Sequence, residues 1–232
     1  VIAMSFSSSL GAVIMPRTSN LIAENKMDEF KTLIQKSYDF VLALAMPLTV
    51  GLIFISPSAI LLLSGEGFAS AILTSQIIAF NILTVSIAGV MGFQVLYPMG
   101  RINTVIFCTF IGAIVNILMN VLLTPVYGHN GTAVAYMLAE VAVTFSMFIL
   151  GRKYIPIQFF KKEHLHYIIG SVVMGIGLYF ISNSQLDNIM MLTFMLLVGG
   201  LTYVGILVVL KDSVSKIIQK TISQYFEKKK IL

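Results

Sequence analysis

The chain has 232 residues, of which 57% are hydrophobic and 11% are charged, and its formal net charge is +5. Soluble domains carry about 25% charged residues, so this composition excludes water as the only solvent and indicates a membrane protein. The basic residues are spread over many loops instead of forming one face with interleaved aromatic residues. We therefore expect no nucleic-acid partner.

Seven apolar segments approach the length of about 20 residues that crosses the hydrocarbon core. They cover residues 1–16, 38–63, 70–97, 102–124, 131–150, 167–183 and 189–210. The pattern predicts an all-α fold, a polytopic bundle of about seven transmembrane helices. In the second segment we expect a kink near Pro47 and a helix end near Pro57. The chain begins at Val1 inside an apolar run, so we expect a fragment whose N-terminal part is missing.

Lysine and arginine alternate between successive connections. The six connections and the C-terminal tail hold, in order, four, none, one, none, four, none and six basic residues. Because basic loops remain on the cytoplasmic side, this alternation predicts seven spans. The N-terminal end of the chain is then outside and the C-terminus is cytoplasmic.

Two segments next to the spans have the spacing of amphipathic helices, residues 20–36 and residues 213–226. For the second we expect a basic anchor on the lipid headgroups. A specific partner site is the alternative.

No enzyme motif is present. The sequence contains no P-loop for ATP-driven transport, and no arrangement of Ser, His and Asp is recognisable. We expect no catalytic residues, no cofactor and no metal site, since His164 and His166 have only Glu163 nearby. Asp39, close to Lys36, is interpreted as an ordinary interfacial charge.

Polar residues inside the apolar segments are the remaining candidates. Glu140 lies near the middle of segment 131–150, where a carboxylate costs about 2.5–3.5 kcal/mol on insertion scales. It either couples transport to a proton or cation, contacts substrate, or ties helices together through hydrogen bonds. Asn116 and Asn120 share one helix face and are candidates for binding substrate, as the lining of a cavity. Hydrogen bonds between helices are the alternative role. The other amides in these segments are Asn81 and Gln94.

Several motifs in a fixed order resemble a transporter family. "VIMPRTSN", an apolar helix that ends in P-R-[ST]-S, is followed by "KSYDFVLALAMPLTVGL", "LLSGEGFASA", "YPMGRIN" and "GAIVNILMNVLLTPVYGHNGTAVAYMLAE". The set resembles the C-terminal half of polysaccharide flippases of the multidrug/oligosaccharidyl-lipid/polysaccharide exporter superfamily. The resemblance implies that residues 1–150 form the second of two lobes. Residues 151–210 add two spans, and residues 211–232 form a basic cytoplasmic tail.

The resemblance further implies a flippase that moves lipid-linked oligosaccharides across the bacterial cytoplasmic membrane by alternating access, for polysaccharide, capsule or O-antigen synthesis. The expected partners are an undecaprenyl diphosphate-linked substrate, the lipid bilayer and the missing N-terminal half. Arg17, at the cytoplasmic mouth, is the first candidate to hold the diphosphate, because a guanidinium can form two hydrogen bonds with phosphate. Arg101 is the second candidate. Both also fit the simpler role of a topology anchor.

Other functions remain open at this point. A cation-coupled multidrug antiporter and a lipid II flippase are the nearest alternatives within the superfamily. From other classes, a non-transporting membrane scaffold and a polysaccharide polymerase are alternatives. A polymerase is expected to carry basic residues in a large outside loop, and the predicted outside loops are short and contain no lysine or arginine.

Overall fold

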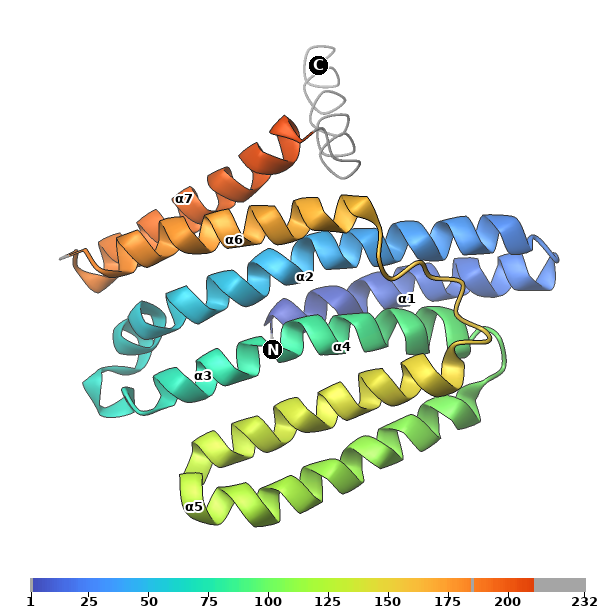
Figure 1. Cartoon of the computed structure of the whole chain (residues 1–232), viewed down its shortest axis with the longest axis horizontal. Helices are drawn as coiled ribbons and strands as arrows, with labels where there is room; N and C mark the ends of the chain where they lie inside the picture. The colour runs from blue at the N-terminus through green and yellow to red at the C-terminus, as the bar shows by residue number, and fades with distance from the viewer. Residues whose placement is uncertain (1, 185, 211–232) are drawn as a thin grey trace, which may run out of the picture.

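Regular structure in the described part of the chain consists of helices. The computed structural model describes residues 2–184 and 186–210, and of residues 2–10 it describes the backbone alone. The predicted all-α membrane bundle is confirmed (Figure 1). The predicted amphipathic helix at 213–226 lies outside the described residues. In chain order the elements are α1 (Ile2–Ala23), α2 (Met27–Ser64), the 3₁₀ helix η1 (Glu66–Phe68), α3 (Ala71–Ala79), α4 (Asn81–Gly89), the π-helix η2 (Val90–Leu96), α5 (Ile102–Gly151), α6 (Lys162–Ser182) and α7 (Asn188–Val209).

Five helical stretches in the described part of the chain are long and apolar enough to cross a membrane. They are Met27–Ser64, Ala71–Leu96, Ile102–Gly151, Lys162–Ser182 and Asn188–Val209. The third contains two of the segments predicted as separate spans, 102–124 and 131–150. The more polar α1, which contains residues 2–16 of the predicted span 1–16, is not among the five.

α5 is a hairpin of two helical arms. Gly128, between the arms, has φ 57° and ψ −134°, a backbone conformation that residues with a side chain rarely adopt. Gly131 is buried against the first arm, where a Cβ would overlap the Leu123 carbonyl group, and a Cβ on Gly112 would overlap Val143 of the second arm. One glycine therefore allows the reversal, and the other two allow the arms to approach closely.

The polar segment after Pro16 is helical. α1 continues through Pro16 to Ala23, so the prediction that the helix ends at this proline is wrong. The hydroxyl groups of Thr18 and Ser19 donate to the Met15 carbonyl at 2.8 and 3.0 Å. The polar side chains thus find acceptors on the helix backbone itself.

A tight turn separates α1 from α2. Asn25 has a positive φ of 56°, and its N–H donates to the Ile22 carbonyl at 3.1 Å, while the Lys26 N–H donates to the Leu21 carbonyl at 2.9 Å. This pair of bonds is a Schellman motif, which ends a helix through a residue in the left-handed conformation. The prediction of one amphipathic helix over 20–36 is therefore wrong, because its two halves belong to α1 and α2.

α2 continues through both of its prolines to Ser64, so the predicted helix end near Pro57 is also wrong. A proline in a helix has no N–H to offer the carbonyl four residues earlier. For Pro57 that carbonyl belongs to Ile53, and it accepts a hydrogen bond from Gln76 Nε2 of α3 at 3.0 Å. For Pro47 it belongs to Ala43, and it accepts one from the Tyr203 hydroxyl of α7 at 2.5 Å. Neighbouring helices therefore supply the donors that the prolines lack.

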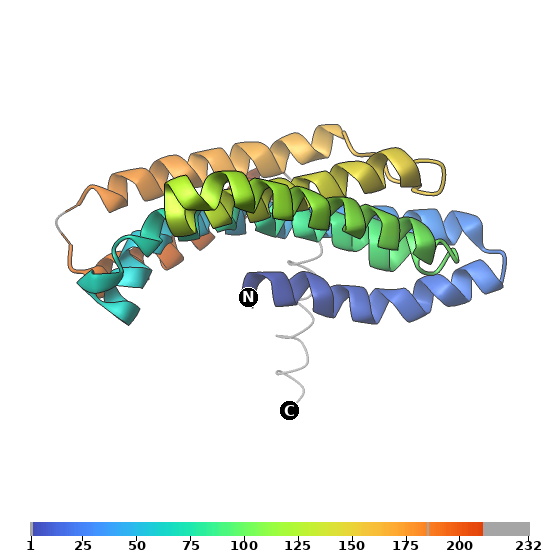
Figure 2. The same cartoon turned by 90° about the horizontal axis from the view of Figure 1, so that it is seen from below.

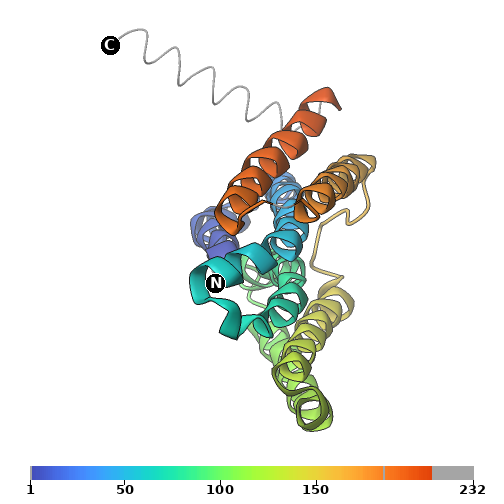
Figure 3. The same ribbon diagram turned by 90° about the vertical axis from the view of Figure 1, so that its left-hand side faces the viewer.

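α2 lies in the middle of the bundle. The helices α1, α3, α4, α6 and α7 all pack against it. α1 lies on one side of the bundle and α6 on the other, as the two turned views show (Figure 2, Figure 3). α5 packs on α3 and α4 and forms an outer edge (Figure 1). The apolar core surrounds α2 and includes Phe30, Ile34, Val41 and Leu42.

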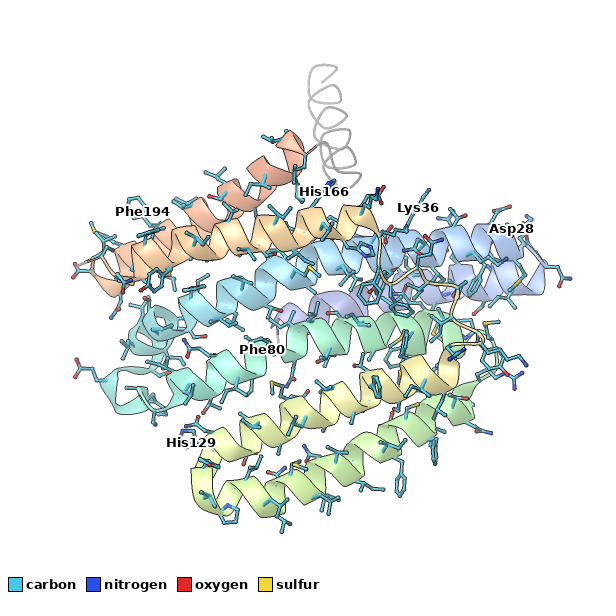
Figure 4. The ribbon with its side chains drawn as sticks, in the orientation of Figure 1. Asp28, Lys36, Phe80, His129, His166 and Phe194 are labelled. Atoms are coloured by element: carbon cyan, nitrogen blue, oxygen red, sulfur yellow. The ribbon has the colours of Figure 1, made fainter. Side chains whose placement is uncertain are left out.

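Basic side chains in the described part of the chain gather toward one end of the bundle, which we call the basic end. They lie in or near the α1–α2, η2–α5 and α5–α6 connections. The connections at the opposite, acidic end carry Glu66, His129 and Asp187 and no lysine or arginine. Figure 4 shows Lys36 toward the basic end and His129 at the acidic end. The basic-end residues are Arg17, Lys26, Lys31, Lys36, Arg101, Arg152, Lys153, Lys161 and Lys162.

Candidate functional site

Arg17 lines a groove between α1 and α2 with a volume of about 430 Å³. Lys36 of α2 lines the same groove, and both basic residues are exposed. Within the described residues neither forms an ion pair, so both remain available to an anionic group. The carboxylates of Asp28 and Glu29 also line the groove and reduce its attraction for anions.

Arg101 lies at the basic end, immediately before α5. Its guanidinium stacks over the ring of Tyr154, 4.4 Å from the ring centroid, which is a cation–π contact. The contact joins the η2–α5 connection to the chain that follows α5. Arg101 therefore has a structural contact of its own, in addition to the role in substrate binding that is expected from the sequence.

Asn116 and Asn120 lie one turn apart on the first arm of α5. Asn120 Nδ2 donates to the backbone carbonyl of Asn116 at 2.9 Å and to its side-chain oxygen at 3.1 Å. The Thr124 hydroxyl donates to Asn120 Oδ1 at 2.9 Å and lies 3.0 Å from the Thr132 hydroxyl on the second arm. The amides thus bond mainly along their own arm, and the two threonines make the link between the arms.

Glu140 lies on the second arm of α5 and is half-buried. Tyr136, one turn earlier, forms a hydrogen bond with its carboxylate. The Thr144 hydroxyl lies one turn later, 2.8 Å from the backbone carbonyl of Glu140 and 3.1 Å from that of Thr84 on α4. The described partners of Glu140 are therefore on its own helix. Within the described residues, no hydrogen bond or ion pair joins it to Arg17, Arg101, Asn116 or Asn120.

A polar cluster at the basic end joins α2 to the start of α6. Asp39 accepts hydrogen bonds from Gln35 Nε2 at 2.7 Å and Lys161 Nζ at 3.1 Å, and His164 Nε2 lies 3.0 Å from its carboxylate. The side chains of Asp39 and His164 are only 13% and 7% exposed. Interpreting Asp39 as an ordinary interfacial charge is therefore wrong.

The same cluster fixes the loop at 152–161 against α2. The Gln158 N–H donates to Gln35 Oε1 at 2.8 Å, and Gln35 Nε2 lies 3.4 Å from the Gln158 carbonyl. Ile155 and Ile157 of this loop are buried in the core. The loop is therefore part of the packed bundle.

The sequence contains little signal for this cluster. Asp39 is 122 residues from Lys161 and 125 residues from His164, and no short-range pattern pairs them. The sequence offers only an acidic residue, Asp39, at the end of one span, and Lys161 and His164 at the start of another. Their pairing depends on α2 and α6 being neighbours, which hydrophobicity does not predict.

The other two amides have different surroundings. Gln94 of η2 is buried, and its Oε1 accepts a hydrogen bond from the Ser37 hydroxyl of α2 at 2.6 Å. Asn81, the first residue of α4, is fully buried. Neither polar atom of its side chain has a hydrogen-bond partner within the described structure.

This chain is similar to known proteins both in sequence and in the arrangement of its helices. A membrane protein of Methanocaldococcus jannaschii, named "Uncharacterized membrane protein MJ1068", is 26% identical to this chain; the alignment covers 93% of this chain and 44% of the relative. A solved structure of the lipid II flippase MurJ in its inward closed conformation matches with a TM-score of 0.75 at 17% identity. That match covers 88% of this chain and 43% of the solved one, and it shows a shared fold.

The chain thus spans less than half the length of both similar proteins. The model of the lipid II flippase MurJ family matches residues 3–200, which is most of the sequence and includes both arms of α5 and all of α6. The chain belongs to the lipid II flippase MurJ family.

Proposed function

We propose that the protein containing this chain is a flippase that moves a polyprenyl diphosphate-linked precursor of the lipid II class across the membrane by alternating access. The observation that carries the proposal is the family match over residues 3–200. The matched family and the similar solved structure are both named as lipid II flippases. They support this substrate class over the polysaccharide precursors expected from the sequence motifs, and a flippase family favours transport over enzymatic catalysis.

The groove between α1 and α2 supports binding of a phosphorylated headgroup. Arg17 and Lys36 are exposed basic residues of one groove at the basic end, and a guanidinium binds phosphate with two parallel hydrogen bonds. Charged hydrogen bonds of this kind contribute about 1.5–3 kcal/mol each. Arg17 is therefore the residue whose loss we expect to weaken substrate binding most.

The distribution of charge supports an orientation. Cytoplasmic loops of membrane proteins are enriched in lysine and arginine, so we place the basic end in the cytoplasm and the acidic end outside. In this orientation Arg17 lies on the cytoplasmic side, from which the substrate is loaded. The location in a bacterial cytoplasmic membrane, and the assignment of residues 1–150 to a second lobe, remain predictions.

Reconstitution of the complete protein into vesicles tests the substrate class. Lipid II and a lipid-linked oligosaccharide on the same carrier are compared as transported lipids. We expect faster movement of lipid II. Faster movement of the lipid-linked oligosaccharide would support a polysaccharide precursor as the substrate. Movement of neither lipid would contradict flippase function.

Substitution of Arg17 tests the headgroup contact. We expect Arg17→Lys and Arg17→Gln both to lower lipid II transport about tenfold or more, because neither side chain forms the two parallel bonds of a guanidinium. The matched control is Lys26→Gln, which removes an exposed charge at the same end that already pairs with Glu24 at 2.6 Å. A wild-type rate of lipid II transport in Arg17→Lys would show that Arg17 acts only as a topology anchor.

A further inference from the structure

An apolar groove lies on the side of the bundle away from α1. Its volume is about 500 Å³, within the range of about 300–1,000 Å³ that is typical of small-molecule sites. Its long walls come from α2, α4 and the second arm of α5. α1, which carries Arg17, contributes no lining residue and lies on the other side of α2 (Figure 3). Representative wall residues are Leu42, Met46, Leu83, Ile87, Val141 and Phe145.

Aromatic side chains close the groove at the basic end. Phe159 packs edge-on against Tyr38 and Phe148, with ring centroids 5.5 and 5.0 Å apart. His164 packs edge-on against Tyr38 at 5.6 Å, and its Nε2 lies 3.0 Å from the carboxylate of Asp39. The polar cluster around Asp39 thus holds this wall in place, and the groove has a defined end.

Exposed basic residues follow closely in the chain after residues that line this end of the groove. Phe160 lines the groove and is 97% exposed, and Lys162 follows it by two residues. Arg152 follows the groove residue Phe148 by one helical turn, about 6 Å of rise, and Lys153 is next. These three basic residues are exposed and form no ion pair within the described residues.

The nearby carboxylates leave this rim positive. Asp39 is already paired with Lys161 and His164, so its charge is compensated inside the bundle. Glu163 is the other carboxylate in this part of the chain, and it offsets one of the three free cations. The end of the groove therefore combines an apolar channel with a net positive rim at the level of the membrane surface.

We propose that this groove binds an anionic phospholipid from the leaflet at the basic end. One acyl chain lies along the apolar walls, and the phosphate lies among Arg152, Lys153 and Lys162. Apolar walls match a hydrocarbon chain, and basic pockets between transmembrane helices bind anionic headgroups. The bound lipid would bridge α2, α5 and α6, and so strengthen the attachment of the last two helices. The site is separate from the transported substrate, so it can fail while the proposed function stands.

Native mass spectrometry tests the rim. The complete protein is released from nanodiscs of equal parts phosphatidylglycerol and phosphatidylcholine, and the retained lipid is identified. We expect retention of phosphatidylglycerol in preference to phosphatidylcholine. The double variant Lys153→Gln/Lys162→Gln should reduce that preference about thirtyfold, since each basic residue near the surface contributes about 1 kcal/mol. The matched control Lys26→Gln/Lys31→Gln removes two exposed lysines at the same end, away from the groove. An equal reduction in the control would overturn the proposal.

A second pair of variants tests the apolar walls. Val141→Trp fills the groove, whereas Val121→Trp adds the same bulk to an exposed position outside it. We expect the first to reduce retained phosphatidylglycerol severalfold and the second to leave it unchanged. Unchanged retention in Val141→Trp would overturn the proposal.

Two further measurements separate the other possible occupants. Truncation after Leu210 should leave retention unchanged, and a marked increase would assign the groove to residues 211–232. Undecaprenyl phosphate should not displace the retained phosphatidylglycerol. Displacement that Val141→Trp abolishes would assign the groove to the carrier lipid of the substrate and overturn the proposal.

Discussion

Asp39 shows how one carboxylate determines the packing of a distant segment. It is nearly buried, and the side chains of Gln35, Lys161 and His164 all bond to it. A buried carboxylate is tolerable only when such donors compensate its charge. The same donors attach the loop and α6 to α2, so this side chain adds polar contacts to the apolar packing that holds the C-terminal helices.

We expect Asp39→Asn to destabilise the protein by about 3 kcal/mol, because it leaves the Lys161 ammonium without its counter-charge in a largely buried site. The measurement is the thermal unfolding midpoint of the purified protein, followed by circular dichroism in detergent. The control is Asp28→Asn, which breaks an exposed pair with Lys31 and should cost under about 1 kcal/mol. Equal shifts for the two variants would show that the Asp39 cluster contributes no special stability.

Glu140 allows a separate test of cation or proton coupling. Glutamine at this position can still accept the hydrogen bond from Tyr136, so the Glu140→Gln variant should fold normally. If the carboxylate carries the coupling ion, this variant loses both transport rate and the dependence of that rate on pH. Tyr136→Phe is the control, since it keeps the carboxylate. A wild-type rate and a wild-type pH profile in Glu140→Gln would leave Glu140 a structural role only.

At the scale of helices, the two prolines of α2 are compensated by side chains from other helices. Gln76 of α3 donates a hydrogen bond to the carbonyl that Pro57 leaves free. Tyr203 of α7 donates one to the carbonyl that Pro47 leaves free. A free carbonyl in the membrane interior is costly because no water can replace the lost donor. These bonds therefore stabilise α2 and also position α3 and α7 against it.

A double-mutant cycle measures this compensation. Tyr203→Phe keeps the ring but leaves the Ala43 carbonyl unsatisfied, so we expect a loss of about 1–3 kcal/mol in unfolding free energy. Pro47→Ala restores an N–H to the helix. In that background the cost of Tyr203→Phe should be clearly smaller, and the readout is unfolding in denaturant for all four proteins. Additive costs would mean that the hydroxyl does not replace the missing N–H.

The α5 hairpin depends on glycine in a comparable way. We expect Gly128→Ala to cost about 1–3 kcal/mol, because a Cβ strains the backbone at φ 57° and ψ −134°. Gly177→Ala in α6 is the control, since it has open space for a Cβ and no positive φ. The control should be neutral or stabilising. Thermal unfolding of both variants decides, and equal midpoints would contradict a special role for Gly128.

These elements show what the sequence can and cannot predict. Hydrophobic length and basic alternation locate most of the helices, because both signals are local to each segment. The helix ends at Pro16 and Pro57 are mispredicted, because a proline inside a helix is expected to break it. At Pro57 the side chain of Gln76 on a neighbouring helix supplies the donor that the proline lacks. The Asp39–His164 contact is missed for the related reason that it depends on which helices are neighbours. Arg17 and Glu140 can be chosen from the sequence, but only the structure shows that they have separate surroundings.

At the scale of the whole molecule, the separation of charge makes orientation testable with two cysteines. Thr32 lies near the basic end and Ser70 at the acidic end; both are exposed and uncharged. Cys108, the single cysteine of the chain, is buried and should not react. Thr32→Cys and Ser70→Cys, made in the complete protein without other cysteines, therefore report the two ends separately.

In intact cells, a membrane-impermeant maleimide should label Ser70→Cys and leave Thr32→Cys unlabelled. The physical reason is that lysine and arginine near the ends of spans resist translocation, whereas the acidic end carries no basic residue in its connections. Permeabilised cells supply the control, because both cysteines should then react. Labelling of Thr32→Cys alone in intact cells would show that the orientation is the opposite one. Arg17 would then lie on the side of substrate release.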